Sequence, residues 1–435
     1  MKKILIISPY FPPCNAADMQ RIRMSLPYFK EFGWEANVVC VHPDFCEVNK
    51  DHLLLEAIPT DIKIYTVKPI SKKWTKKIGL GSIAIRSLNA IRKKVDVLLN
   101  KEHFDLIYFS TTQFPVCILG NYWKKRFGIP YIIDMQDPWH SDYYINKPKA
   151  EQPPKYWFSY RLNKWLEPLA MKHVDGLISV SEAYIKTLQI RYHNILNIPY
   201  KVITFGAFDQ DFSIAEKHQF DYSSMIPHKN EDVVNVVYVG RGGLDMKDAL
   251  VKLFSAFRLG LRQEASLFKN IHFYFLGTSY APDGQGKQTI FPLAQEMGIA
   301  AYVTEQTNRI PFYQTLNTLK SADLLFIAGS NDPQYTASKT YPYMFSKNPL
   351  LAIFHQDSSA AKIIRECNAG EVITFDMPED TAIHQIYINL KNTLLKQGKP
   401  FIGNESELNN YSARNKTAEQ CDFFELVLSS LNTSR

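Results

Sequence analysis

A glycine-rich segment, residues 239–247, has the residue types that bind an anion, with the sequence Val-Gly-Arg-Gly-Gly-Leu-Asp-Met-Lys. It follows an apolar run that predicts a buried strand, and it precedes a predicted helix. Glycine lets the backbone approach a ligand closely, and a helix N-terminus offers unpaired N–H groups and positive potential to a phosphate. The segment therefore predicts a phosphate site at Gly240, Arg241, Gly242 and Lys247, and the alternative is a structural turn with one surface arginine.

A second basic segment, residues 335–343, follows another predicted strand. We expect Ser338 to be the N-cap of the helix that comes next, with Pro342 in the first turn, where its missing N–H costs little. Lys339 at a helix start is unfavourable for the helix dipole unless an anion lies there. The two segments together predict one diphosphate site, and the alternative for Lys339 alone is an exposed lysine near a helix start.

These segments belong to two stretches in which apolar strands alternate with helices. The strands predicted in the first stretch are 3–8, 35–41, 62–67, 105–110, 130–135 and 174–180. Those in the second are 233–239, 271–276, 302–304, 323–328, 350–354 and 371–375. Continuous apolar strands separated by helices are typical of parallel sheets covered on both faces, so we predict an α/β protein with two doubly wound, Rossmann-like domains facing a central cleft.

The length of 435 residues also favours two domains. A polar stretch separates the two halves, so we predict a first domain over 1–208, a linker over 209–232 and a second domain over 233–410. The remaining 411–435 should form a C-terminal helix.

The composition excludes several classes of protein. No apolar run approaches the roughly 20 residues that cross a bilayer, and no secretory signal is visible. The six cysteines, at positions 14, 40, 46, 117, 367 and 421, have no metal or redox spacing, which favours a cytoplasmic protein without a metal site. The net charge is +7, but the chain has no basic motif interleaved with aromatic residues. We therefore expect no nucleic-acid partner.

Short motifs along the whole chain carry a family resemblance. They lie at residues 4–13, 32–38, 104–108, 129–134, 174–181 and 205–209, and their order is specific although each is weak alone. On these motifs the chain resembles the retaining GT-B glycosyltransferases, often called family four, that build bacterial lipopolysaccharide, capsule and glycolipids. The resemblance implies transfer of a sugar from a nucleotide diphosphate sugar to a glycan or lipid-linked acceptor, without a tightly bound cofactor. It also implies that the C-terminal helix packs back on the first domain.

The resemblance also assigns roles to residues. Arg241 and Lys247 would bind the donor diphosphate, and the donor site would further include Gly277, Thr278, Ser338 and Lys339. The catalytic candidates, on the loop after 130–135, are Asp137, the first choice, and His140; the alternative for His140 is a hydrated loop. On the acceptor side the candidates are Asn15, Asp18 and Arg21.

Two departures from the family pattern leave alternatives open. In one, residues 15–18 (Asn-Ala-Ala-Asp) replace the glycines of the family's first loop. Many members carry two glutamates, one of which grips the ribose, where this chain has Gln334 and Pro342, and neither side chain replaces a carboxylate. A catalytically silent binding or assembly protein is therefore the first alternative, and a nucleotide-sugar epimerase the second. A basic segment, residues 72–101, suggests peripheral contact with an anionic membrane at its cytoplasmic face, and the alternative is a solvated helix face.

Overall fold

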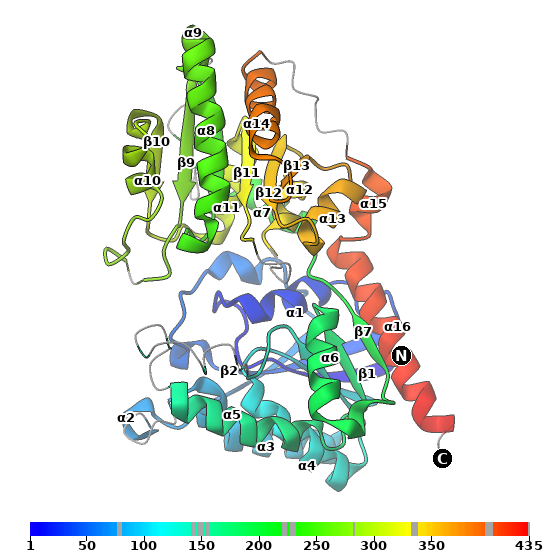
Figure 1. Cartoon of the computed structure of the whole chain (residues 1–435). Coiled ribbons are helices and arrows are strands. Elements are labelled where there is room, and N and C mark those ends of the chain that lie inside the picture. Colours follow the sequence, from blue (N-terminus) through cyan, green and yellow to red (C-terminus); the bar gives the residue numbers. More distant parts are fainter. Residues whose placement is uncertain are drawn as a thin grey trace. The chain divides into compact units, whose positions relative to one another are not determined.

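A computed structural model describes residues 1–75, 81–140, 142, 145, 149, 152, 156–219, 224–226, 232–281, 283–331, 338–395 and 403–433. The chain divides into two compact units (Figure 1). The first unit comprises Met1–Phe205 together with Ala413–Arg435, and the second comprises Gly206–Ser412.

The first unit contains a seven-stranded parallel sheet in the order β3-β2-β1-β4-β5-β6-β7. Its strands are β1 (Lys2–Ile7), β2 (Trp34–Val41), β3 (Lys63–Val67), β4 (Leu106–Ser110), β5 (Tyr131–Met135), β6 (Gly176–Ser179) and β7 (Tyr200–Val202). The strand order reverses between β1 and β4, and ligands bind at such switch points in open α/β sheets.

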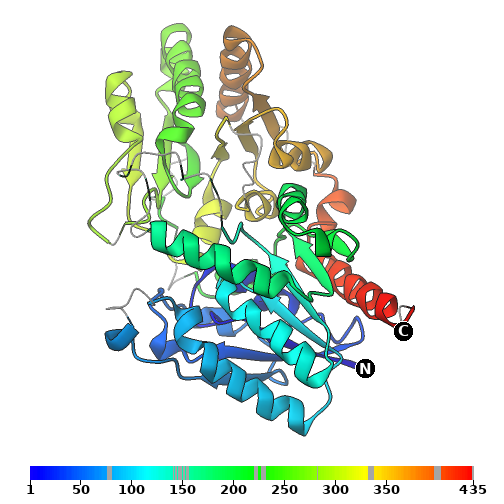
Figure 2. The same cartoon turned by 60° about the horizontal axis from the view of Figure 1, so that its bottom comes forward.

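Helices cover both faces of this sheet, as Figure 2 shows from a second side. They are α1 (Gln20–Ser25), α2 (Lys72–Thr75), α3 (Ile83–Lys101), α4 (Ile118–Phe127), α5 (Tyr156–Met171), α6 (Glu182–Arg191) and α16 (Ala413–Thr433). The short 3-10 turns of this unit are Ala17–Met19, Pro43–Phe45, His52–Leu55, Phe114–Cys117 and His193–Ile195. Helix α1 ends at Ser25, although Leu26, the residue before Pro27, still has helical backbone angles.

Helix α16 packs on the first unit although it is the last helix of the chain. Phe424 makes edge contacts with Trp34 and Tyr108, at ring-centroid distances of 5.4 and 5.0 Å. Phe423 and Val427 are also buried there, beside α1. Burial of these large apolar side chains is what holds the helix to the sheet.

The second unit contains a six-stranded parallel sheet in the order β10-β9-β8-β11-β12-β13. Its strands are β8 (Val234–Val239), β9 (Ile271–Leu276), β10 (Val303–Gln306), β11 (Leu324–Ala328), β12 (Leu350–Phe354) and β13 (Glu371–Thr374). Its switch point lies between β8 and β11, so the loops that follow these two strands border the same crevice.

The helices of the second unit are α7 (Asp209–Lys217), α8 (Lys247–Gln263), α9 (Ala265–Phe268), α10 (Phe291–Glu296), α11 (Phe312–Ser321), α12 (Thr340–Phe345), α13 (Ser359–Glu366), α14 (Glu379–Leu394) and α15 (Glu405–Asn409). Its 3-10 turns are Leu244–Met246 and Ala300–Tyr302. The core lies between α8, α14 and the sheet.

Residues 209–217, expected in the linker, form helix α7 and belong to the second unit. This helix packs on α11: the Tyr313 hydroxyl donates to Asp211 Oδ1 at 3.3 Å, and Asn317 Nδ2 donates to the Ala215 carbonyl at 3.1 Å. Residues 209–217 are mostly polar, which is why they were expected in the linker. Phe212, Ile214 and Ala215 are nevertheless buried in the second unit.

The predicted fold class is confirmed, because each unit is a doubly wound α/β structure with a fully parallel sheet. Every strand predicted from the sequence is present, with its ends shifted by about two residues at most. The short strand β7 was not predicted.

Candidate functional site

The loops after β8 and β9 are joined by backbone hydrogen bonds. Gly240 N donates to the Leu276 carbonyl at 2.9 Å, and Gly242 N donates to the Thr278 carbonyl at 2.9 Å. Four residues predicted to bind the donor, the two glycines with Gly277 and Thr278, therefore lie in neighbouring loops at the carboxyl edge of the second sheet.

Glu305, in β10, holds the loop after β9 in place. It was not predicted from the sequence. Its carboxylate accepts from Thr278 Oγ1 at 2.8 Å. It also accepts from three consecutive backbone N–H groups, of Thr289, Ile290 and Phe291, at 3.1, 2.9 and 2.7 Å. A buried carboxylate with four donors holds its surroundings firmly, so Glu305 fixes the position of Thr278.

Lys339 lies against the same loops. Its Nζ lies 4.4 Å from the centroid of the Tyr238 ring and donates to the Tyr238 hydroxyl, which in turn donates to the Arg241 carbonyl at 2.7 Å. Burial, together with the nearby positive charge of Arg241, lowers the pKa of Lys339 to about 7. Among the described residues, no carboxylate makes a hydrogen bond to the Lys339 ammonium group, and a bound anion would favour its charged form.

Because Gly240 has no side chain, the Lys339 side chain can lie next to its backbone. Gly240 has a φ of 148°, and a Cβ there would lie 2.9 Å from Lys339 Nζ and 3.4 Å from the Tyr238 hydroxyl. Both the conformation and the close approach favour glycine at this position.

Helix α12 begins at Thr340, so its N-cap is Lys339 and not Ser338 as predicted. Ser338 is exposed. Pro342 lies in the first turn, as predicted. A contact missed in the sequence ties this helix to the end of β8: the Tyr343 hydroxyl accepts from Val239 N at 2.6 Å and donates to the Val239 carbonyl at 3.0 Å.

Arg241 forms a two-point ion pair with Asp245, at 3.1 Å from Nη1 to Oδ1 and 2.7 Å from Nη2 to Oδ2. The ion pair lies close against Gly243. A Cβ at this glycine would lie 2.4 Å from Arg241 Nη1 and 2.3 Å from Asp245 Oδ1. Lys247 is exposed at the first position of α8. Of the ribose-site positions, Gln334 lies outside the described residues.

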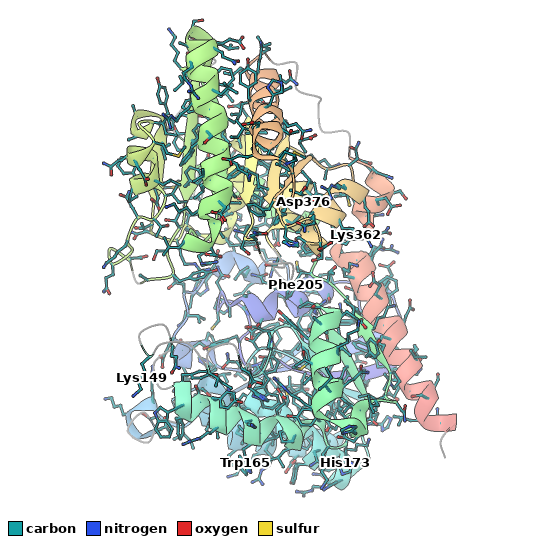
Figure 3. All side chains as sticks on the ribbon, viewed as in Figure 1. Lys149, Trp165, His173, Phe205, Lys362 and Asp376 are labelled. Atoms are coloured by element: carbon teal, nitrogen blue, oxygen red, sulfur yellow. The ribbon has the colours of Figure 1, made fainter. Side chains whose placement is uncertain are left out.

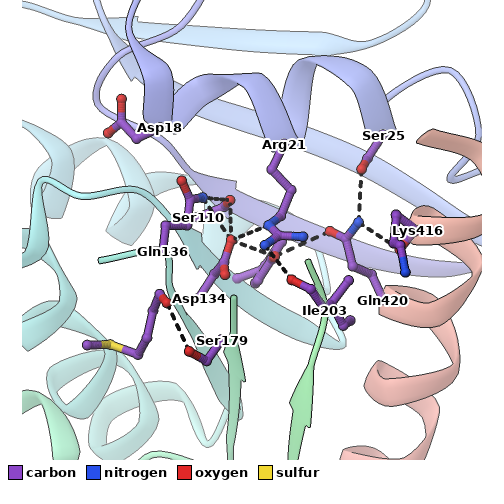
Figure 4. A network of polar contacts seen from close by, with 12 residues as sticks. Asp18, Arg21, Ser25, Ser110, Asp134, Gln136, Ser179, Ile203, Lys416 and Gln420 are labelled. Carbon is purple, nitrogen blue, oxygen red and sulfur yellow. Dashed lines mark hydrogen bonds and ion pairs between the residues drawn. The ribbon is translucent and has the colours of Figure 1, made fainter. Parts of the chain in front are cut away.

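The first unit has a buried polar network below the carboxyl end of β5 (Figure 4). Asp134 and Arg21 form its centre, with 2.7 Å between Oδ2 and Nε and almost no exposed surface. The same carboxylate oxygen accepts from Ser110 Oγ at 3.0 Å and Gln136 Nε2 at 2.8 Å. Arg21 also donates to the carbonyl of Ile203 at 2.8 Å. The other oxygens of this network, Asp134 Oδ1 and Gln136 Oε1, have no hydrogen-bond partner among the described residues.

Of the predicted acceptor-side residues, Arg21 belongs to this network and Asp18 lies near it (Figure 4). Asp18 accepts from Thr111 Oγ1 at 2.7 Å and from Thr112 N at 3.0 Å, which joins the loop after β1 to the loop after β4. Burial raises the pKa of Asp18. Asn15 is half-buried, and its backbone N–H donates to the Asn49 carbonyl at 2.8 Å. Asp18 and Arg21 therefore lie at the switch point of the first sheet.

The two catalytic candidates, Asp137 and His140, differ in their exposure to solvent. Asp137 is exposed on the loop after β5. His140 is buried, with Nδ1 3.2 Å from Glu167 Oε2, and Arg191 Nη1 donates both to the other Glu167 oxygen and to the His140 carbonyl. The predicted alternative of a hydrated loop is therefore wrong for His140, because its side chain belongs to a buried charge network.

Within the described ranges, no three His, Cys, Asp or Glu side chains are arranged to hold a metal ion. No helix in these ranges is both long and apolar enough to span a bilayer. All six cysteines are free thiols and buried.

The two doubly wound units have the fold of the GT-B glycosyltransferases, and solved structures of that class resemble the chain over nearly its full length. One is a UDP-forming α,α-trehalose-phosphate synthase from Burkholderia xenovorans in complex with glucose-6-phosphate, at 10% identity and a TM-score of 0.60, covering 97% of this chain and 100% of its own. A sucrose-phosphate synthase from Thermosynechococcus elongatus has 13% identity and a TM-score of 0.58, covering 99% and 100%. Anabaena HepE, solved in complex with UDP-glucose, has 16% identity and a TM-score of 0.53, covering 100% of both chains.

No protein-family model matches the chain, and no curated protein sequence matches it significantly. At identities this low the similarity establishes the fold, and activity has to be argued from the site.

Proposed function

We propose that the chain is a glycosyltransferase that moves a sugar from a nucleotide diphosphate sugar to a glycan or lipid-linked acceptor. The observation that carries the proposal is the cluster of Gly240, Arg241 and Lys339 at the switch point of the second unit. Two cationic side chains, one with its pKa lowered by burial, converge there on loops whose glycines admit a ligand to the backbone.

The chemistry that such a cluster supports is departure of a diphosphate. In sugar transfer the acceptor hydroxyl oxygen bonds to the anomeric carbon and releases its proton to water, while the bond from that carbon to the phosphate oxygen breaks. The electron pair of the broken bond leaves with the nucleoside diphosphate. Negative charge therefore grows on the diphosphate in the transition state, and Arg241 and Lys339 would stabilise it there, with Lys247 adding charge from the start of α8.

The proposal extends to the first unit as the acceptor side. Asp137 is exposed at the carboxyl edge of its sheet, and a carboxylate there would orient the transferred sugar or stabilise positive charge at the anomeric carbon. Asn15, Asp18 and Arg21 would shape the acceptor pocket. We propose that His140 is a positioning residue, because its side chain is buried against Glu167 and holds the loop that carries Asp137.

The finer features rest on the sequence resemblance: retention of configuration, transfer without a bound metal, and a role in bacterial surface polysaccharide synthesis at the cytoplasmic side of a membrane. The donor site offers one supporting feature, since Arg241, Lys247 and Lys339 provide three positive charges for a diphosphate. The anomeric configuration of a purified product, determined by NMR, tests retention directly.

The proposal is tested by calorimetric titration of the protein with UDP, GDP and ADP, followed by transfer assays with the matching sugar donors and candidate acceptors. We expect one nucleotide to bind, and the Arg241→Ala and Lys339→Ala variants to weaken it at least about tenfold, since charge-assisted contacts to phosphate are strong. Lys362→Ala, an exposed lysine of the same unit, is the control. Absence of binding to every nucleotide would support the catalytically silent alternative, and a changed sugar without any acceptor would support the epimerase.

A further inference from the structure

Helix α5 exposes two tryptophans on its outer face. Trp157 and Trp165 are 63% and 64% exposed, whereas Trp34, Trp123 and Trp139 are buried. Indole rings are large and apolar, and they are rarely left in water without a partner. At 100° per residue, both tryptophans lie within one quarter-turn of the helix surface, on the side away from the buried Leu166 and Ala170.

The same face is positively charged. Arg161, Lys164 and Lys172 are exposed and fall within the arc between the tryptophans or at its margin. The only carboxylate between residues 156 and 173 is Glu167, which is fully buried and ion-paired with Arg191. We call the set of Trp157, Arg161, Lys164, Trp165 and Lys172 the α5 face.

Contacts around the α5 face hold its charges close to its rings. The Arg161 guanidinium lies 5.6 Å from the centroid of the Trp157 ring. At the far end of the helix Lys124 Nζ, from α4, donates to the His173 carbonyl at 2.9 Å, and Asp175 Oδ1, 2.6 Å away, balances its charge. Figure 3 labels Trp165 and His173 along this outer side.

We propose that the α5 face binds an anionic lipid bilayer. Tryptophan prefers the boundary between headgroups and acyl chains, because its ring is apolar while its N–H can hydrogen-bond. Arg and Lys on the same face attract anionic headgroups, and their aliphatic stems lie along apolar surface. A helix with aromatic and basic residues on one face is the pattern that lies in the membrane interface rather than spanning the bilayer.

The basic segment predicted to make this contact, residues 72–101, has fewer of these properties. Lys72 pairs with Glu47, and Lys94 lies over the Tyr65 ring at 4.9 Å. Lys76 and Lys77 lie outside the described residues. The α5 face combines exposed basic side chains with exposed tryptophan rings, so it replaces 72–101 as the membrane contact.

The test is flotation of the full-length protein with phosphatidylcholine vesicles that contain either none or about a third of phosphatidylglycerol. We expect binding to the anionic vesicles alone, weakened by salt. Trp157→Ser/Trp165→Ser and Arg161→Glu/Lys164→Glu should each lower binding at least about tenfold, since each charge near an anionic surface contributes several-fold. Brominated lipids should quench tryptophan fluorescence in the wild type and lose most of that effect in Trp157→Phe/Trp165→Phe.

Control variants change apolar and basic residues elsewhere in the first unit. Leu426→Ser removes an exposed apolar side chain of α16, and Lys93→Glu/Lys94→Glu reverses two charges of the segment 72–101. Unchanged thermal unfolding of all variants shows that the fold is intact. The proposal is overturned if anionic vesicles do not bind the protein, or if only the Lys93 and Lys94 variant loses binding. Nucleotide binding without vesicles is a separate measurement, so this proposal can fail while the proposed function stands.

Discussion

The Arg241 guanidinium meets the Asp245 carboxylate at two points, 2.7 and 3.1 Å apart, directly above Gly243. A carboxylate and a phosphate present similar oxygen pairs to a guanidinium. Asp245 therefore occupies the side of Arg241 that a diphosphate would use. Donor binding would exchange one anion for another at this position.

Replacement of Asp245 by asparagine should tighten binding of the nucleoside diphosphate about two- to fivefold. An exposed ion pair four residues apart in sequence contributes only ~0.5 kcal/mol, and its loss releases Arg241 and removes a repelling charge. Calorimetry measures the change. Asp248→Asn, one turn further along and exposed, changes the net charge equally and should have a smaller effect. Equal gains in both variants would show that only the overall charge matters.

Nucleotide binding should depend on pH through Lys339. In the free protein the pKa of Lys339 is lowered to about 7 by burial and by Arg241. A bound diphosphate favours the charged form and raises this pKa in the complex. Below pH 7 the lysine is charged in both states, so the contribution of Lys339 to affinity is constant there. As the pH rises above 7, binding takes up a proton, and affinity should fall by up to about tenfold per pH unit.

The Lys339→Gln variant should bind more weakly and lose this pH dependence. Titration in two buffers of different ionisation enthalpy reports proton uptake directly. A wild-type affinity that is flat between pH 7 and pH 9 would show that Lys339 does not contact the bound anion.

Gly240→Ala should abolish most nucleotide binding, because its Cβ would displace Lys339 and its backbone conformation disfavours a side chain. The matched control is Gly33→Ala, which has a φ of 82° but no atom within 4 Å of the added Cβ. Both variants should lower the free energy of unfolding by about 1–2 kcal/mol, the range for backbone strain of this kind. Only Gly240→Ala should lose affinity.

Arg21→Met should destabilise the first unit by about 3–5 kcal/mol, because it leaves the Asp134 carboxylate buried without its ion-pair partner. The double variant Arg21→Met/Asp134→Asn should recover part of that loss. Urea denaturation measures both. Arg414→Ala, which breaks the exposed pair with Glu31, should change stability little. A small effect of Arg21→Met would indicate that water reaches the network.

The sequence predicted what depends on local pattern. Apolar runs located the strands, and the glycine-rich segment before α8 located one loop of the candidate donor site. Lys339 was also predicted, although the reason given was its place at a helix start. In the structure its importance comes from Tyr238 and Gly240, roughly a hundred residues earlier in the chain.

Residues that act through distant contacts could not be predicted. Glu305 lies in a short strand and is polar like its neighbours, and only the folded chain brings the Thr278 hydroxyl and three N–H groups to it. The pairing of Arg21 with Asp134 joins positions more than a hundred residues apart. The burial of His140 could not be predicted, because its partner Glu167 lies later in the chain, on α5. Single-sequence patterns report periodicity and turns, and they do not report which side chains meet.

The most direct test of the proposed donor site is a crystal structure of the protein with the nucleoside diphosphate that binds in solution. We expect the diphosphate at the loop of residues 240–243, with its oxygens in hydrogen-bonding contact with Arg241 and Lys339 and with Asp245 displaced from Arg241. A diphosphate bound elsewhere, with the Arg241–Asp245 pair intact, would contradict it.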